Sequence, residues 1–131
     1  MRLVLILAAV VSAGCSHPAT YPNNGDFAAN WIGPSGTDNW TELHLHQNGD
    51  SIDGAYVMVS ANGDGMRDSL PLNGSAAGRE ATLHWVERNG AEYDITANVI
   101  LARDGLSLSG TWSINSGRAL SFGPYHRVSS P

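Results

Sequence analysis

Short stretches in which apolar and polar residues alternate run along most of the chain, separated by turns rich in glycine, asparagine and aspartate. Alternation places successive side chains on opposite faces of a β-strand, and no stretch keeps the spacing of an amphipathic helix. The pattern predicts an all-β protein. Its strands are expected at residues 27–32, 41–47, 51–59, 68–73, 79–88, 92–101, 106–114 and 118–128.

The turns between these strands predict how the strands pair. Asn48-Gly49, Asn89-Gly90 and Asp104-Gly105 supply the positive φ angles of tight hairpins, so neighbours in the chain should pair antiparallel. A flat meander of eight strands would leave two edges unpaired. We therefore expect an antiparallel up-and-down meander that forms a closed or nearly closed eight-stranded β-barrel.

The alternation also assigns the faces of the strands. Four inward-facing rows are predicted: Ala81, Leu83 and Trp85; Ile95, Ala97, Val99 and Leu101; Leu106, Leu108, Gly110 and Trp112; and Ile52, Gly54, Tyr56 and Met58. Pro71 has no N–H group to donate, so an edge or an irregular strand is expected at that position, where closure of the barrel should be weakest.

The first residues read as a targeting signal. Arg2 is followed by the apolar run 3–11 and by small residues up to Cys15. Because a transmembrane helix needs about 20 apolar residues, this run is too short to span a bilayer. Residues 1–14 are expected to be a signal peptide that directs export.

The segment Val11-Ser12-Ala13-Gly14-Cys15 resembles the lipobox of bacterial lipoproteins, with Ser12 where that family prefers an aliphatic residue. The resemblance implies cleavage before Cys15 and attachment of lipid to its sulfur. Ser16, in place of an aspartate, implies sorting to the outer membrane, facing the periplasm. Residues 15–26 are then the acylated cysteine and a flexible tether, and residues 27–131 are the barrel domain.

Composition limits the partners. The chain has 131 residues, of which 42% are hydrophobic, which suits one small folded domain. Twelve acidic residues outnumber seven arginines, there is no lysine, and the formal net charge is −5. No basic patch offers the positive surface that nucleic acids require. The membrane would be a partner through the N-terminal lipid alone, since an acidic domain is not attracted electrostatically to anionic lipid head groups.

The barrel resembles avidin-type and lipocalin-type small barrels. Trp31 lies in the first strand, residues 52–56 follow a hairpin, residues 109–112 include Trp112, and Arg127 lies in the last strand. The resemblance implies that Trp31 plugs the floor of the barrel and that Arg127 packs over it. Ala29 stands where both families usually have glycine, and no polar cluster in the first strand matches a biotin site, so biotin binding is not implied.

Two groups of residues are candidate sites. Glu42, His44 and His46 lie at alternate positions of one strand and face outward, where they could hold zinc or simply be solvated. Large aromatic side chains could line a ligand cavity or fill the core. The aromatic candidates are Trp40, Tyr56, Trp85 and Trp112.

No catalytic motif accompanies these candidates. The sequence shows no marked triad, no phosphate-binding glycine loop and no paired catalytic carboxylates, so no enzymatic activity and no cofactor are expected. Residues 62–68 faintly resemble a calcium loop but lack its liganding carboxylates, and a hairpin tip is expected there.

These observations predict an outer-membrane-anchored lipoprotein whose small barrel binds a small apolar ligand or an envelope protein. The alternative is a periplasmic inhibitor or immunity-type lipoprotein that blocks a basic enzyme with its acidic surface and loops. A filled barrel without a cavity would favour the alternative.

Overall fold

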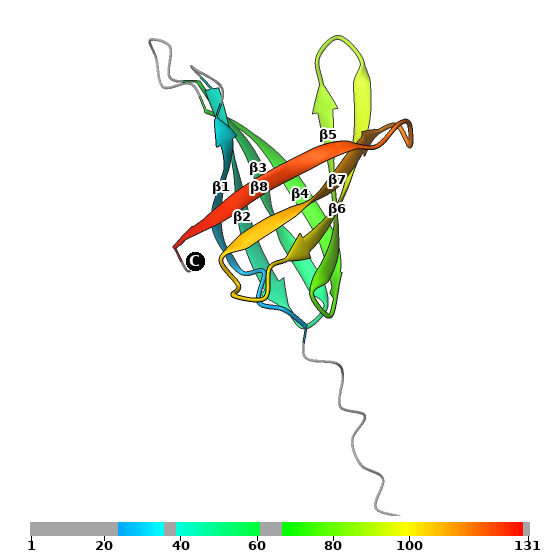
Figure 1. Ribbon diagram of the computed structural model, residues 1–131. Coiled ribbons are helices and arrows are strands. Elements are labelled where there is room, and N and C mark those ends of the chain that lie inside the picture. Colours follow the sequence, from blue (N-terminus) through cyan, green and yellow to red (C-terminus); the bar gives the residue numbers. More distant parts are fainter. Residues whose placement is uncertain (1–23, 36–38, 61–66, 130–131) are drawn as a thin grey trace, which may run out of the picture.

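The computed structural model describes residues 24–35, 39–60 and 67–129, which form an all-β barrel (Figure 1). Each strand pairs antiparallel with the next, and the first pairs with the last, so the predicted closed meander of eight strands is confirmed. No helix in these residues is long and apolar enough to cross a membrane. The strands are β1 (Ala29–Ser35), β2 (Asn39–Asn48), β3 (Ser51–Ser60), β4 (Arg67–Ala77), β5 (Glu80–Arg88), β6 (Glu92–Leu101), β7 (Ser107–Ile114) and β8 (Leu120–Ser129).

The clearest difference from the predicted strands is the length of β4. The predicted strands end at residue 73 and resume at residue 79, with glycine at both ends of the gap, yet β4 continues to Ala77. A Cβ atom on Gly74 would lie 2.2 Å from the backbone oxygen of Thr82. This glycine therefore allows β4 and β5 to approach closely and does not break the strand.

Most inward-facing rows are confirmed. The alternate residues from Ala81 to Trp85 and from Ile95 to Leu101 are buried in the core. Tyr56 pairs with the buried Leu43, which places its row on the inner face of β3. The prediction for Leu106 was wrong: its side chain is 58% exposed because β7 begins one residue later, at Ser107.

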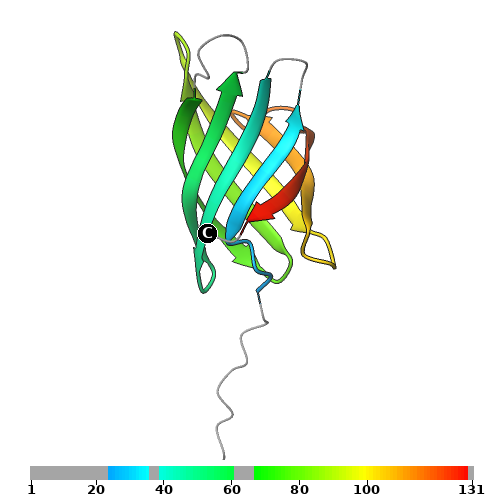
Figure 2. The same cartoon turned by 90° about the vertical axis from the view of Figure 1, so that its left-hand side faces the viewer.

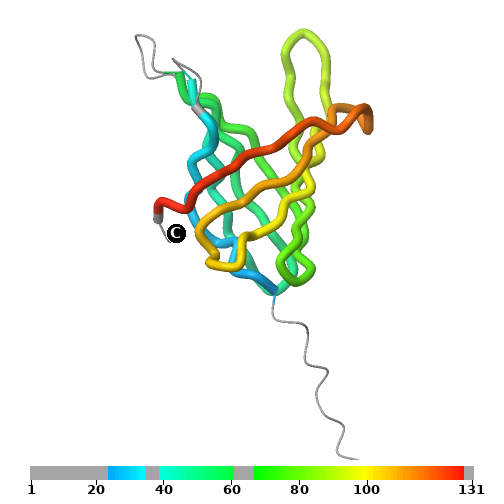
Figure 3. The backbone as a smooth tube through the Cα atoms, viewed as in Figure 1, coloured from blue at the N-terminus to red at the C-terminus, as the bar shows by residue number. Residues whose placement is uncertain are grey.

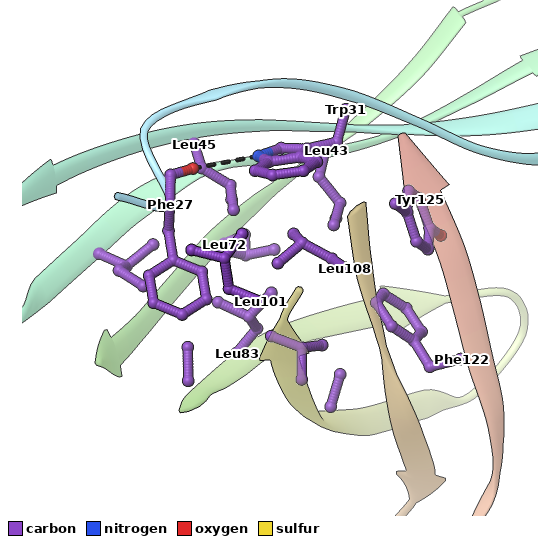
Figure 4. Packing of buried hydrophobic residues seen from close by; sticks show 14 of the residues in the cluster. Phe27, Trp31, Leu43, Leu45, Leu72, Leu83, Leu101, Leu108, Phe122 and Tyr125 are labelled. Atoms are coloured by element: carbon purple, nitrogen blue, oxygen red, sulfur yellow. Dashed lines mark hydrogen bonds between the residues drawn. The ribbon is translucent and has the colours of Figure 1, made fainter. Parts of the chain in front are cut away.

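The N-terminal end of the described chain closes one end of the barrel, which we call the floor (Figure 3). Phe27 is fully buried, and its carbonyl oxygen accepts a hydrogen bond from Trp31 Nε1 at 3.0 Å (Figure 4). The Arg127 guanidinium lies 4.7 Å from the centre of the Trp31 ring. The plug and the covering cation expected from the resemblance are both present.

The last residues of the predicted tether belong to this floor. Gly25 N donates to Gly78 O at 2.6 Å, and Gly78 N donates to Asn24 Oδ1 at 2.9 Å. The chain thus enters the barrel at the floor, beside the β2–β3 and β4–β5 turns (Figure 2). The opposite end, which we call the mouth, carries the β5–β6 and β7–β8 connections.

The barrel wall has a notch at the mouth. Between β4 and β5 the ladder begins at Leu72, which pairs with Trp85, and the residues of β4 before Leu72 pair with β3 alone. On the other side of the notch, residues 86–88 of β5 pair with β6 alone. The prediction of an edge at Pro71, where closure should be weakest, is therefore confirmed, because the barrel is closed but the unpaired edge of β4 starts at Pro71 and runs toward the mouth.

Candidate functional site

Aromatic side chains from three strands form a continuous layer inside the mouth. The rings of Tyr56 and Trp85 stack with centroids 4.6 Å apart and planes 17° from parallel. Trp85 lies 6.1 Å from Phe122, and Phe122 stacks on Tyr125 at 4.7 Å. Offset stacking of this kind adds to the stabilisation that burial of the rings provides. Phe122 and Tyr125 of this layer lie at one side of the buried cluster (Figure 4).

Above this layer lies a cavity of about 180 Å³. Its lining includes the predicted residues Tyr56, Trp85 and Trp112. Trp112 packs partly buried against the core and lines the cavity, and it stacks on none of the described rings. Sites for drug-sized ligands usually occupy about 300–1,000 Å³, so this cavity suits a side chain or a small head group.

Polar atoms are few in this cavity. Thr41 Oγ1 and the Tyr125 hydroxyl lie 2.8 Å apart and share a hydrogen bond. Burial raises the pKa of Tyr125, although its bond to Thr41 opposes the shift. Burial also raises the pKa of Tyr56, and the nearby Tyr125 and Glu87 add to that shift. Both phenols are therefore neutral at physiological pH, so neither supplies a charge to the cavity.

Glu87 brings a carboxylate to the inner edge of the mouth. Its neighbour across the ladder is Tyr93, and it lies two residues after the inward-facing Trp85. Trp85 Nε1 donates a hydrogen bond to Glu87 Oε1 at 3.3 Å. Glu87 forms no ion pair with any other described residue. It therefore contributes an uncompensated negative charge beside the aromatic layer.

The wall of the mouth carries large apolar side chains that are left partly exposed. Ile114 pairs with the buried Ile95, and Leu120 pairs with Trp112, so both face inward above the cavity. Their exposed fractions are 38% and 44%, and that of Tyr93 is 36%. These residues extend the apolar surface of the cavity onto the inner side of β6, β7 and β8.

A larger groove lies on the outer wall but has different chemistry. It measures about 360 Å³ and is lined by side chains from β4 to β7 that include no aromatic ring. Ser75, Thr82, Asn98 and Thr111 contribute neutral polar groups, and Thr82 Oγ1 donates to Asn98 Oδ1 at 3.0 Å. Glu80 also lines this groove, which therefore has a charge but no aromatic surface, whereas aromatic rings line the mouth cavity and Glu87 is hydrogen-bonded to one of them, Trp85.

Trp40, the fourth aromatic candidate, lies on the outside of the barrel. It pairs with Val59 on the outer face, and its Nε1 donates to Glu42 Oε1 at 2.9 Å. Trp40 therefore takes no part in the mouth cavity. It instead belongs to an outer cluster in which Val57 and Val59 are only 5% exposed.

Glu42 is the centre of this outer cluster. Arg67 donates to both of its oxygens, at 2.7 and 2.9 Å, and His44 Nε2 lies 2.7 Å from Oε2. Burial acts to raise the pKa of Glu42, but the hydrogen bonds to Trp40 and His44 and the charge of Arg67 lower it below its ordinary value. The carboxylate therefore stays ionised with three neighbours already bound to it.

This arrangement bears on the predicted metal site. Glu42 and His44 do meet, whereas His46 is exposed and forms no hydrogen bond or ion pair with either of them. Across residues 24–35, 39–60 and 67–129, no three histidine, cysteine or acidic side chains are placed to hold a metal ion. Arg67 and Trp40 occupy the oxygens that a metal would need.

Several predicted features lie outside the described residues. They are the signal peptide 1–14, the lipid attachment site Cys15, the tether up to residue 23 and the tip of the segment 62–68 up to Met66.

Sequence reasoning missed several residues of the mouth. Glu87 follows Trp85 by two positions, so strict alternation already places both on one face. Tyr125 follows the inward Phe122 by three positions, and alternation alone would turn it outward. A register shift between β7 and β8 near Gly110 returns Tyr125 to the inner face.

No protein-family model, no curated protein and no solved structure matches this chain.

Proposed function

We propose that this protein is a non-enzymatic lipoprotein, anchored in the outer membrane through Cys15, that binds an apolar group at the mouth of its barrel. The group is a small apolar ligand or a side chain of an envelope protein. The observation that carries the binding proposal is the cavity of about 180 Å³, which aromatic rings line and exposed apolar side chains surround. When such a group is buried there, apolar surface of the group and apolar surface of the cavity are both removed from water, which favours binding.

The size of the cavity favours a protruding group over an enclosed ligand. From Phe27 to Phe122 the interior is filled by the buried cluster, and the cavity lies above the aromatic layer. A side chain of a partner protein could enter this space while its surroundings cover Ile114 and Leu120. The filled interior also supports the second candidate, an inhibitor of a basic periplasmic enzyme, because such a protein needs a surface and no deep cavity.

The position of the mouth agrees with anchoring at the N-terminus. The described chain begins at Asn24, at the floor, and the mouth lies at the opposite end (Figure 1). A lipid on Cys15 would hold the floor toward the membrane and leave the mouth facing away from it. The anchor and the binding site would therefore not compete for the same end of the barrel.

The anchor is tested by intact mass and membrane fractionation of the expressed protein beside a Cys15→Ala variant. We expect the wild type to lose residues 1–14, to gain the mass of a diacylglyceryl group and to pellet with the outer membrane, unlike the variant. A soluble wild type with a free thiol at Cys15 would show that the anchor does not exist.

The mouth is tested by titrating the folded domain with benzyl alcohol while the four indole N–H signals are followed by NMR. Trp85 and Trp112 line the cavity, whereas Trp31 lies in the floor and Trp40 on the outer face. Saturable shifts of Trp85 and Trp112, with Trp31 and Trp40 unchanged, are expected. Equal shifts of all four signals, or none, would contradict binding at the mouth.

A further inference from the structure

We propose that the mouth recognises an organic cation, an ammonium or guanidinium group carried on an apolar stem, with Glu87 as its counter-charge. This inference rests on the proposed function and names the chemical class of the group that enters the cavity. It combines three observations: the aromatic surface, the inward-facing carboxylate and the absence of a cation already bound to that carboxylate among the described residues.

The aromatic surface provides the first half of the site. The face of an aromatic ring carries partial negative charge and attracts a cation within about 6 Å of its centre. Tyr56 and Trp85 cover one another's faces in part, whereas Trp112 is free of other described rings and lines the same cavity. Because both tyrosines nearby remain protonated, the attraction comes from the rings and not from a phenolate.

Glu87 provides the second half. Its Oε1 accepts from the indole of Trp85, which holds the carboxylate against the rim of the aromatic layer. Asp68 adds a second acidic group across the notch, because it pairs with the inward-facing Met58. A charge at this partly desolvated rim interacts more strongly with a bound cation than it would in bulk water.

The arginines at this end of the barrel do not neutralise Glu87. Arg67 is bound to Glu42 on the outer face, and Arg88 pairs with Glu92 at 3.3 Å. Arg118, in the β7–β8 connection, forms no ion pair within the described residues. The negative charge at the mouth is thus available to a cation from outside.

The floor of the same barrel shows that the fold can hold a cation over a ring. The Arg127 guanidinium lies 4.7 Å from the centre of Trp31, and its Nε donates to Gly105 O at 2.9 Å. The ring and oxygen acceptors together satisfy that cation. At the mouth, Trp112 lines the cavity and Glu87 is bound to Trp85 of the same lining, so a ring and an oxygen acceptor are offered to a ligand there.

Matched pairs of probes test this inference. Choline represents a quaternary ammonium head group, and 3,3-dimethylbutan-1-ol is its neutral isostere. Nα-acetyl-lysine N-methylamide, whose side-chain ammonium is free, represents a side chain of a basic protein, and Nα-acetyl-norleucine N-methylamide is its neutral partner. Each is titrated into the folded domain while the indole signals of Trp85 and Trp112 are followed. At least one cation should bind about tenfold more tightly than its neutral partner, which corresponds to about 1.4 kcal/mol. The pair with the larger preference identifies the source of the cation.

Glu87→Gln should abolish this preference and leave the affinity for the neutral probes within about twofold. The glutamine keeps an oxygen that can accept from Trp85, so the fold should be retained, which thermal unfolding would verify. Glu80→Gln removes an exposed carboxylate at the floor end of the same strand and should leave the preference unchanged. Asp68→Asn should have a smaller effect than Glu87→Gln.

The outcomes separate this inference from the proposed function. Equal affinity for cationic and neutral probes, or a preference that survives in Glu87→Gln, would overturn the cation site while binding at the mouth stands. If no probe shifts the indole signals of Trp85 and Trp112, both the cation site and binding at the mouth are overturned. A cation that shifts Trp31 or Trp40 instead would show that the mouth is not its site.

Discussion

At the scale of single residues, the chemistry of this barrel depends on where polar groups are buried. Tyr56 and Tyr125 lie in the apolar mouth, and Glu42 lies on an outer face that its neighbours cover. In each case burial would disfavour the charged form. The tyrosines stay neutral for this reason, whereas Glu42 is kept ionised by the groups that bind it.

The two tyrosines give a prediction for alkaline pH. Because the folded pKa of each is raised above the ordinary value of 10.0, each stabilises the folded state below pH 10 and loses that contribution as pH rises toward the folded pKa. Phenolate absorbance at 295 nm should therefore be the same near pH 10 in the wild type, in Tyr56→Phe and in Tyr125→Phe. A smaller absorbance step in either folded variant would show that the tyrosine ionises normally.

Glu42 gives the opposite dependence, at acid pH. Its folded pKa lies below 4.5, so the ionised carboxylate stabilises the fold above that pH and the contribution is lost as pH falls through the folded value. Glu42→Gln should lower the free energy of unfolding at pH 7 by about 1–3 kcal/mol, with the difference shrinking in acid.

Urea unfolding at several pH values measures this effect. Glu92→Gln is the control, because Glu92 and Arg88 are both well exposed and such pairs contribute less than about 1 kcal/mol. A Glu42→Gln deficit that stays constant from pH 7 to pH 3 would contradict the role assigned to the charge.

At the scale of elements, the two ends of the barrel differ because different segments complete them. The floor is completed by residues 24–28, which bring Phe27 under the buried cluster. The mouth lacks such a plug in the described residues, and β4 and β5 separate there. The same eight strands therefore produce a closed end and an end with a hollow.

The floor segment should be energetically important. Phe27→Ala removes a fully buried ring and is expected to lower the free energy of unfolding by about 3–5 kcal/mol. Ile100→Ala, at an outward site that is 48% exposed, should change it by less than about 0.5 kcal/mol. Similar unfolding curves for the two variants would show that residues 24–28 do not close the barrel.

Much of this element-level structure follows from local sequence. Hairpin dipeptides and alternation predict the number, order and pairing of the strands, and Pro71 predicts the notch. The departures arise from long-range contacts. Gly74 reads locally as a turn but permits the close approach of β5, and the register shift that returns Tyr125 to the interior depends on β7.

The candidate site shows the same division. Tyr56, Trp85 and Trp112 could be predicted as inward-facing, and they do meet in one cavity. Trp40 was not separated from them because the predicted strand began at residue 41; in β2, which begins at Asn39, Trp40 lies two positions before Glu42 and shares its outward face. The contact between Glu42 and Arg67 could not be predicted from the sequence either, since Arg67 lies 25 residues away in the chain.

At the scale of the whole molecule, the proposed anchor and the mouth lie at opposite ends. The nine residues from Cys15 to Asn23 can span at most about 32 Å when fully extended, at 3.3–3.6 Å per residue. An acylated Cys15 would therefore keep the floor close to the bilayer and the mouth farther away.

This orientation can be measured by energy transfer to acceptor lipids. A donor is placed at Asn89→Cys in the β5–β6 connection or at Asp104→Cys in the β6–β7 connection, since acylation blocks the thiol of Cys15. The donor at position 104 should be quenched more strongly than the donor at position 89. Equal quenching would contradict an orientation set by the floor.

The most direct test of binding at the mouth is site-specific photocrosslinking in cells that produce the anchored protein. A benzophenone side chain replaces either Leu120, which faces the mouth, or Ile100, which faces outward on the wall. The account predicts a discrete adduct of higher mass from position 120, lost when Trp112 is also replaced by alanine, and no such adduct from position 100. An adduct from position 100 alone, or one from position 120 that persists without Trp112, would show that the protein binds elsewhere.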